Sequence, residues 1–348
     1  MNHPVNPEPL LDQYRRWRSD NPKARFIDGA RALRVPEAAL VDGALRPLGH
    51  AKPLRRSWPA ILDALQTLGP VMALTRNATT VHEKIGAYPK LMHEGVHALF
   101  LSEDIDLRLF LGRWGSGFAV DVHTPRGVRP SLQFFDTEGT AVHKIYAVEG
   151  TDEAAWDTLV STYADEDVPA PKFTPIPTPE IRPDEAVDTR LLADRWRGLQ
   201  DTHDFFPMLR SLKLERQQAL RLAPHDLACT LPEDTVPTLL ESAAETGLDI
   251  MVFVGNPGCI QIHTGPVHTV KWVGHWINVL DPGFNLHLRM NQVASTWRVV
   301  KPTVDGPVHS IELFDHEGGL MAQFFGRRKP GTPEDERWRA LVSALATR

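Results

Sequence analysis

The sequence has 348 residues, of which 42% are hydrophobic and 24% are charged, and its formal net charge at pH 7 is -6. This length favours two domains, and the acidic balance argues against a general affinity for nucleic acid or anionic membranes. The two cysteines, Cys229 and Cys259, form no CxxC motif, so we expect neither a disulfide framework nor a cysteine zinc site. The N-terminus does not read as a signal peptide, and no run of about 18 apolar residues occurs, so a cytoplasmic protein is the default expectation.

The first half of the sequence predicts helices followed by strands. Residues 11–41 are expected to be helical with a break at 20–22, and a further helix is predicted at 58–68. From Val71 the sequence changes to short runs that are rich in apolar and β-branched residues, and several runs end in turn signals. The runs are VMALTR, VHALFL, DLRLFL, GFAVDVH, SLQFFD and AVHKIYAV. Strands that follow one another without helices between them predict an antiparallel meander.

A helix predicted at 156–163 closes the first half. The next segment, DEDVPAPKFTPIPTPEIRPDE at 165–185, is rich in proline, which favours extended backbone and excludes a helix. We therefore interpret residues 166–190 as a linker, residues 1–165 as a first repeat and residues 191–348 as a second repeat.

The two repeats are related by a constant offset. Trp17 and Trp196 are 179 residues apart, since 196 − 17 = 179, and the same offset relates Phe135 to Phe314. Within this register, SLQFFDTEG aligns with SIELFDHEG. A register that persists over so long a stretch indicates an internal duplication of a unit in which helices precede a sheet. The predicted fold class is therefore α+β, with the two units packed sheet against sheet or side by side.

The second repeat carries one histidine where the helical period predicts an apolar residue. In the stretch 194–212, the positions at steps of three and four are Trp196, Leu199, His203 and Phe206. His203 is therefore expected to point inward. A buried imidazole requires a hydrogen bond, a carboxylate or a metal ion, because an unpaired one destabilises the fold by roughly 1–3 kcal/mol. A core histidine bonded to a backbone carbonyl is the simpler alternative.

A site that is used once must break the symmetry of the duplication. His203 corresponds to Ala24, so the inward imidazole is expected in the second repeat alone. Arg108 corresponds to His287. If Leu107 and its alternate neighbours fill the core, Arg108 faces the other side of its strand, towards a cleft between sheet and helices.

Three features together favour a large, flat, apolar ligand with carboxylates. Aromatic residues are plentiful among the candidates to line the site, namely Phe110, Phe205, Phe253, Phe324 and Phe325. Cationic side chains that bind acid groups through charge-assisted hydrogen bonds accompany them, namely Arg216, Lys301, Arg327 and Arg328. His203 supplies a ligand for iron. Haem meets all three requirements, and a solvated rim is the alternative reading of each basic residue.

The sequence resembles the bacterial cytoplasmic haemin-degrading and haem-transport factors of the HemS, ChuS and PhuS type. The resemblance covers nearly the whole chain, duplication included. The motifs that carry it are DNPKARFIDGARAL, ALTRNATTVHEKIGAY, DIDLRLFLGRWGSGFAV, SLQFFDTEGTAVHKIY, DTHDFFPML, LERQQALR, MVFVGNPGCIQIHTG and WRVVKPT.

The resemblance implies a tandem α+β duplication with two large antiparallel sheets stacked centrally and helices on their flanks. One haem would lie in the second half, with His203 as the proximal iron ligand and Arg108 reaching its distal side. Arg216 and Lys301 match positions that contact the propionates. The remaining haem-binding residues that it implies are Phe110, Phe253, Gln323, Phe325 and Arg327. Phe325 stands where the family form has a tyrosine, which argues against a hydroxyl contact there.

Two functions remain open on the sequence alone. A carrier would take up imported haem and pass it to a separate haem oxygenase, whereas an enzyme would open the porphyrin itself with electrons from a reductase and use Arg108 on the distal side. An inner-membrane haem importer is an expected partner in either case. Nucleic-acid binding is a weaker alternative because no basic stripe accompanies the acidic balance. A second haem near His287 is also weaker, because Ala24 removes the matching ligand.

Overall fold

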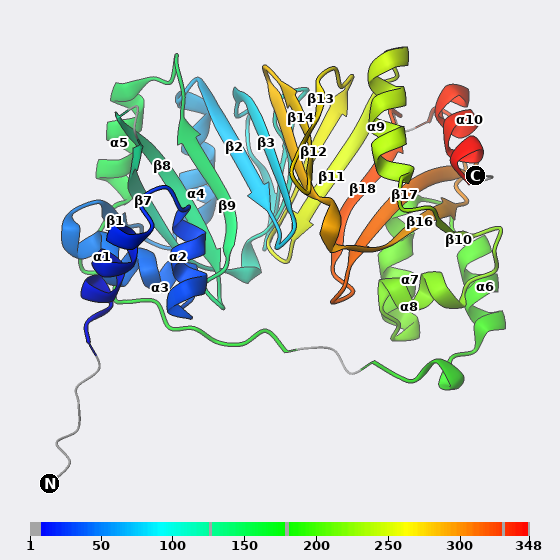
Figure 1. The fold of residues 1–348 in the computed structure, drawn as a ribbon, viewed down its shortest axis with the longest axis horizontal. Helices are drawn as coiled ribbons and strands as arrows, with labels where there is room; N and C mark the ends of the chain where they lie inside the picture. The colour runs from blue at the N-terminus through cyan, green and yellow to red at the C-terminus, as the bar shows by residue number, and fades with distance from the viewer. Residues whose placement is uncertain (1–7, 125–126, 178–180, 329–330, 347–348) are drawn as a thin grey trace, which may run out of the picture. The chain divides into compact units, whose positions relative to one another are not determined.

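The computed structural model describes residues 8–124, 127–177, 181–328 and 331–346 (Figure 1). The chain divides into two compact units, which are described separately. Unit 1 comprises Met1–Thr75, Lys84–Pro177 and Asn256–Ile260. Unit 2 comprises Arg76–Glu83, Thr178–Gly255 and Gln261–Arg348. Among the described residues, no helix combines the length and the apolar character that crossing a membrane requires.

The helices of unit 1 fall close to the predicted positions. In unit 1 they are α1 (Leu10–Asp20), α2 (Phe26–Leu33), α3 (Glu37–Leu40), α4 (Trp58–Ala64) and α5 (Glu153–Tyr163). In unit 2 they are α6 (Thr189–Arg197), α7 (Phe205–Leu212), α8 (Arg216–Leu222), α9 (Thr235–Thr246) and α10 (Glu336–Leu345). Shorter 3₁₀ or π turns are η1 (Val41–Leu45), η2 (Arg46–Leu48), η3 (Leu65–Thr67), η4 (Leu111–Arg113), η5 (Asp184–Ala186), η6 (Thr202–Asp204) and η7 (Met290–Gln292).

In the first half, each predicted run contains a strand, and the structure adds strands that the runs did not predict. The strands in the first half are β1 (Ala51–Pro53), β2 (Pro70–Arg76), β3 (Thr80–Ala87), β4 (Met92–Glu94), β5 (His97–Leu101), β6 (Asp106–Phe110), β7 (Trp114–Thr124), β8 (Gly127–Asp136) and β9 (Ala141–Ala147). Those in the second half are β10 (Ala228–Leu231), β11 (Ile250–Asn256), β12 (Cys259–Gly265), β13 (Val270–Val273), β14 (Trp276–Asp281), β15 (Phe284–Arg289), β16 (Val293–Lys301), β17 (Val308–Asp315) and β18 (Leu320–Gly326).

The strands form two antiparallel sheets of nine strands each. One sheet has the order β1-β7-β8-β9-β2-β3-β15-β14-β13, and the other has the order β10-β16-β17-β18-β11-β12-β6-β5-β4. The predicted α+β fold with two large sheets is confirmed. The prediction of one meander in each half is wrong, because each half divides its strands between both sheets. Alternating hydrophobicity indicates which face of a strand is buried, but it does not indicate which strand pairs with it.

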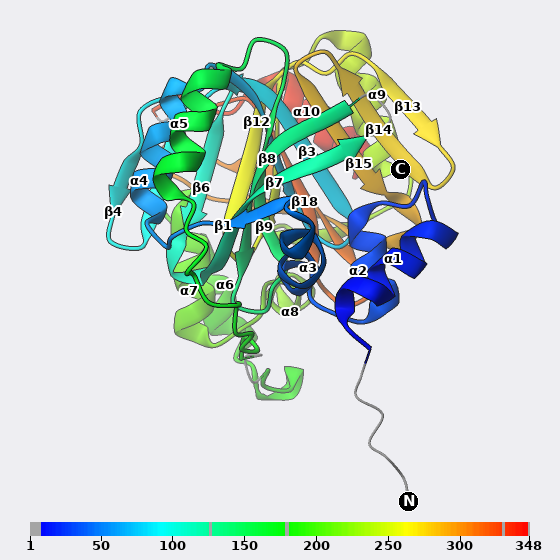
Figure 2. The ribbon, with the colours of Figure 1, turned by 90° about the vertical axis from the view of Figure 1, so that its left-hand side faces the viewer.

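The core of unit 1 lies between strands of the two sheets. Leu107 and Leu109 on β6 share an apolar cluster with Leu132 and Phe134 on β8. The period of two along β6 confirms the prediction that Leu107 and Leu109 are buried. Figures 1 and 2 show α1, α2 and α3 grouped together in this unit, apart from α4 and α5.

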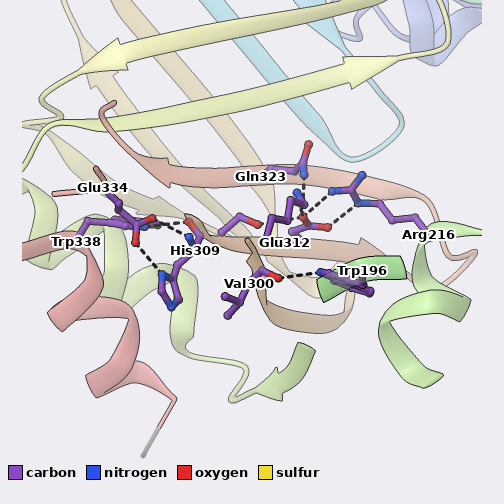
Figure 3. Close-up of polar contacts among 10 residues, drawn as sticks. Trp196, Arg216, Val300, His309, Glu312, Gln323, Glu334 and Trp338 are labelled. Atoms are coloured by element: carbon purple, nitrogen blue, oxygen red, sulfur yellow. Dashed lines mark hydrogen bonds and ion pairs between the residues drawn. The ribbon is translucent and has the colours of Figure 1, made fainter. Parts of the chain in front are cut away.

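Unit 2 has two apolar layers on opposite faces of β17. On one face, Ile311 and Leu313 pack in a cluster with residues of β14, β15, α9 and α10. On the other face, Phe314 belongs to a cluster that includes Trp196 of α6 and Phe205 of α7. The indole N–H of Trp196 donates to the carbonyl oxygen of Val300, 2.9 Å away, and this hydrogen bond links α6 to β16 (Figure 3). These contacts hold α6, α7 and α8 against the face of the sheet that carries the candidate site.

The duplication is visible in the elements themselves. Residues 26–33 of α2 and 205–212 of α7 differ by 179, as do residues 141–147 of β9 and 320–326 of β18. Both helices end at a residue with left-handed backbone, Arg34 with φ 55° and Lys213 with φ 54°. The internal duplication predicted from the sequence therefore extends to matching helix ends.

Candidate functional site

The stretch 194–212 is two helices joined by a turn. Helix α6 ends at Arg197, and η6 precedes α7. The carboxylate of Asp201 accepts the backbone N–H of His203 at 2.8 Å, and the carboxylate of Asp204 accepts the backbone N–H of Asp201 at 3.0 Å. This reciprocal capping box begins a new helix, so the helical period does not continue across the turn.

The prediction that His203 points inward is therefore wrong. Its side chain is 90% exposed, and Phe205 takes the buried position, with its ring centroid 4.6 Å from that of Trp196. The Nδ1 atom of His203 lies 2.5 Å from Oδ1 of Asp201. The imidazole is thus held at one edge by a carboxylate and is accessible from solvent.

The sheet face that packs against α6, α7 and α8 carries one buried acid, Glu312, among half-exposed side chains. Cross-strand pairing aligns Trp297 of β16 with Glu312 of β17, Glu312 with Gln323 of β18, and Gln323 with Phe253 of β11. On the next row, Phe325 pairs with Met251. Because neighbours along a strand alternate, this face is opposite to the one that carries Ile311 and Leu313.

Glu312 is the centre of a buried polar cluster (Figure 3). The Nε and Nη2 atoms of Arg216 each lie 2.6 Å from a different carboxylate oxygen of Glu312, which makes a bidentate pair. The same carboxylate accepts hydrogen bonds from Gln323 at 2.9 Å, from Ser310 at 3.1 Å and from Lys301 at 3.4 Å. The cluster joins α8 to three neighbouring strands.

Two cations share the single carboxylate of Glu312. Burial by itself raises the pKa of Glu312, but the charges of Arg216 and Lys301, together with hydrogen bonds from Arg216 and Gln323, outweigh that effect and lower the pKa to about 2. Burial lowers the pKa of Lys301 to about 8, although the charge of Glu312 opposes this shift. With both cations protonated, the cluster has one positive charge in excess and is suited to a further acid group.

Aromatic rings lie directly beside these cations. The ring centroid of Phe205 is 5.0 Å from Cζ of Arg216 and 4.9 Å from Nζ of Lys301. Lys301 is also 5.4 Å from the ring centroid of Phe325, which in turn lies 5.0 Å from the ring of Phe253. Phe253 and Phe325 are half-exposed, so they offer apolar surface next to the positive charge.

The other candidate site residues of unit 2, Phe324, Arg327 and Arg328, contact different groups. Phe324 is fully buried on the opposite face of β18, so the prediction that it lines the site is wrong. The Nη1 atom of Arg327 lies 2.7 Å from a carboxylate oxygen of Asp249, and Arg328 lies 3.6 Å from Asp305. These ion pairs engage both arginines with carboxylates of the protein.

Arg108 and Phe110 belong to unit 1. Both lie on the half-buried face of β6, as the sequence predicts. Arg108 forms an ion pair with Asp106 on the same face, and Phe110 lies edge-on to the ring of His97. Their assignment to haem binding stays a prediction.

The sequence analysis missed Glu312 and Asp201. Comparison of the repeats contains a signal for Glu312, because the offset of 179 places Gln133 opposite Glu312 and Glu37 opposite Arg216. In unit 1, Glu37 forms a buried ion pair with Lys144 at 2.6 Å. The signal for Asp201 is its position two residues before His203, a spacing at which an Asp side chain caps the following turn.

Known proteins match the chain over nearly its whole length. The family model for the haemin-degrading HemS.ChuX domain matches residues 34–163 and 213–345. The hemin transport protein HemS of Yersinia enterocolitica is 39% identical over 337 residues, which cover 97% of each chain. Holo-PhuS, a haem-binding protein from Pseudomonas aeruginosa, is 44% identical with a TM-score of 0.93, covering 97% of this chain and 98% of its own. ChuS, an E. coli haem oxygenase, is 37% identical with a TM-score of 0.88, covering 96% of this chain and 99% of its own. The chain therefore belongs to the HemS family of haemin-degrading domains.

Proposed function

We propose that this protein binds one haem on unit 2 and carries it in haem uptake and iron acquisition. His203 would be the axial ligand of the iron, Arg216 and Lys301 would bind a carboxylate of the porphyrin, and Phe253 and Phe325 would pack against its ring. Two neighbouring features carry the proposal. On the turn before α7, the exposed imidazole of His203 is held by the carboxylate of Asp201. At the start of α7, Phe205 contacts Arg216 and Lys301, the two cations that share the buried carboxylate of Glu312.

These residues fit the chemical character of haem. Haem supplies an iron that binds imidazole, a wide apolar ring and two acid groups. The imidazole is accessible, the cationic cluster has an excess positive charge, and aromatic surface adjoins it. Gln323 would orient the cluster through its bond to Glu312, and Arg327 would bind a porphyrin acid group only by leaving Asp249. Holo-PhuS is a haem-binding protein and HemS is a hemin transport protein, which supports the same ligand.

The proposal is tested by titrating haemin into the wild type, His203→Ala and His287→Ala. We expect His203→Ala to weaken haem binding by roughly tenfold or more and to shift the Soret maximum, because the iron loses its protein ligand. His287 is a matched control, since it is a half-buried histidine of the same unit with its own partner, Asn278, at 2.7 Å. His287→Ala is expected to leave affinity and spectrum unchanged. Equal effects of the two substitutions would contradict the proposal.

A further inference from the structure

One carboxylate oxygen of Asp201 contacts His203 twice. Oδ1 accepts the backbone N–H of His203 at 2.8 Å and lies 2.5 Å from its ring atom Nδ1. Asp201 is itself held in place, because the carboxylate of Asp204 accepts the backbone N–H groups of Asp201 at 3.0 Å and of Gln200 at 3.3 Å. The imidazole is therefore attached to a fixed acceptor even though it is exposed to solvent.

Capping of the turn accounts for only the backbone contact. Asp152 and Asp188, which cap α5 and α6, each accept a backbone N–H with their side chain, from Ala155 and Leu191 respectively. Asp201 adds a bond to a ring nitrogen, which capping does not require. The repeats support a paired role, since Pro22 and Ala24 stand at the positions equivalent to Asp201 and His203, so the first repeat lacks both members.

We infer that Asp201 is a positioning residue for haem iron, which holds the Nδ1–H of His203 and leaves Nε2 free as the iron ligand. The inference rests on the proposed function. A neutral imidazole has a single N–H, and the partner of one ring nitrogen decides which nitrogen keeps the lone pair. A carboxylate partner also makes the imidazole a stronger donor to a metal, as outer partners of ligating histidines generally do. A stronger donor favours ferric over ferrous iron, so Asp201 lowers the reduction potential of the bound haem.

The test compares Asp201→Asn with Asp188→Asn in the full-length haem complex. The amide oxygen of Asp201→Asn still caps the turn, but a neutral acceptor binds the Nδ1–H about half as strongly as a carboxylate does. We expect Asp201→Asn to raise the midpoint potential of the haem, to lower the iron–histidine stretching frequency of the ferrous complex in resonance Raman spectra, and to weaken ferric haem binding by about tenfold. Asp188→Asn makes the same change at the cap of α6, where Asp188 accepts the backbone N–H of Leu191, so it is expected to leave the potential and the stretching frequency at their wild-type values.

The outcomes separate this inference from the proposed function. If His203→Ala loses the wild-type spectrum while Asp201→Asn keeps the wild-type potential and stretching frequency, Asp201 is only a helix cap. The inference is then wrong, while the proposed function stands. Equal shifts in Asp201→Asn and Asp188→Asn would overturn it as well, because the effect would then come from the change of a capping carboxylate and not from the bond to the ring. If His203→Ala binds haem with an unchanged spectrum, the proposed function and the inference fall together.

Discussion

Lys301 is a buried amine whose charge depends on pH near neutrality. Its side chain is 4% exposed, and burial lowers its pKa to about 8 from an ordinary 10.5. Between these two values the unfolded chain binds a proton that the folded chain does not, so this residue makes the free energy of unfolding rise with pH in that window. Below pH 8 the amine is a cation.

The charge of Lys301 predicts a pH dependence of ligand binding. Metal-free protoporphyrin carries the same carboxylates as haem without the iron, so its affinity reports the cations separately from His203. We expect this affinity to be level below pH 8 and to fall by up to tenfold per pH unit above it, because the neutral amine no longer attracts a carboxylate. Fluorescence titration from pH 6.5 to 9.5 measures the effect. In Lys301→Met the affinity should be lower than in the wild type and should not change with pH. If the affinity of that variant falls above pH 8 as it does in the wild type, another group is responsible for the titration.

At the scale of elements, the cluster around Glu312 links α8 to β16, β17 and β18. The carboxylate is fully buried and bonded to Arg216 and Lys301. A buried ion pair contributes little net stability over an apolar replacement, but the loss of one partner leaves a buried charge without compensation. The cluster is therefore a sensitive point in the face that carries the site.

Substitution of Glu312 is expected to destabilise unit 2. Glu312→Ala should lower the free energy of unfolding by roughly 3–5 kcal/mol, because both cations lose their anion. Urea denaturation at pH 7 measures this, and Glu317→Ala, an exposed glutamate of the following turn, is the control. Because the pKa of Glu312 is about 2 in the fold and ordinarily 4.5, its contribution is present above pH 4.5 and is lost as the pH falls towards 2. In Glu312→Gln, the free energy of unfolding should lack the part of its fall between pH 4.5 and 2 that comes from residue 312. A Glu312→Ala variant as stable as Glu317→Ala would show that the cluster is dispensable.

The sequence predicted elements better than it predicted the site. Alternation placed Leu107 and Arg108 on the correct faces of β6, because a strand exposes every second residue whatever its partner is. The helical period failed at His203, because a capping box interrupts the helix where the apolar spacing happens to continue. Glu312 was overlooked because a glutamate in a strand usually faces solvent, and its burial depends on cations brought by α8 and β16.

At the scale of the whole molecule, the duplication produced two repeats whose equivalent polar clusters differ. Unit 2 has two cations on Glu312 together with His203, whereas the equivalent cluster of unit 1 is the pair Glu37–Lys144 and has Ala24 in place of the histidine. The same backbone plan therefore carries two cations on the carboxylate of Glu312 in unit 2 and the ion pair Glu37–Lys144 in unit 1.

This asymmetry predicts one haem per chain. Titration of haemin, followed at the Soret band and by mass spectrometry under native conditions, should saturate at one equivalent. His287 has Asn278 as a partner, and burial lowers its pKa. A second tight equivalent that disappears in His287→Ala would show that we have overlooked a site.

The exposure of His203 also bears on the fate of the ligand. If His203 binds the iron as proposed, its place on an open turn would allow haem to leave without rearrangement of the core, which favours transfer over retention. We therefore expect the Soret band of the loaded protein to survive ascorbate when catalase removes free peroxide, and to disappear once an apo haem oxygenase is added. Loss of the band with catalase present and no acceptor would show that the protein opens the porphyrin itself.

The identity of the iron ligand is tested most directly by a crystal structure of the haem complex, with the iron located by its anomalous scattering. We predict that the iron is bonded to Nε2 of His203 while Nδ1 stays with Asp201, and that a porphyrin carboxylate contacts Arg216 or Lys301. Iron bonded to another side chain, with His203 in contact only with protein, would contradict the account.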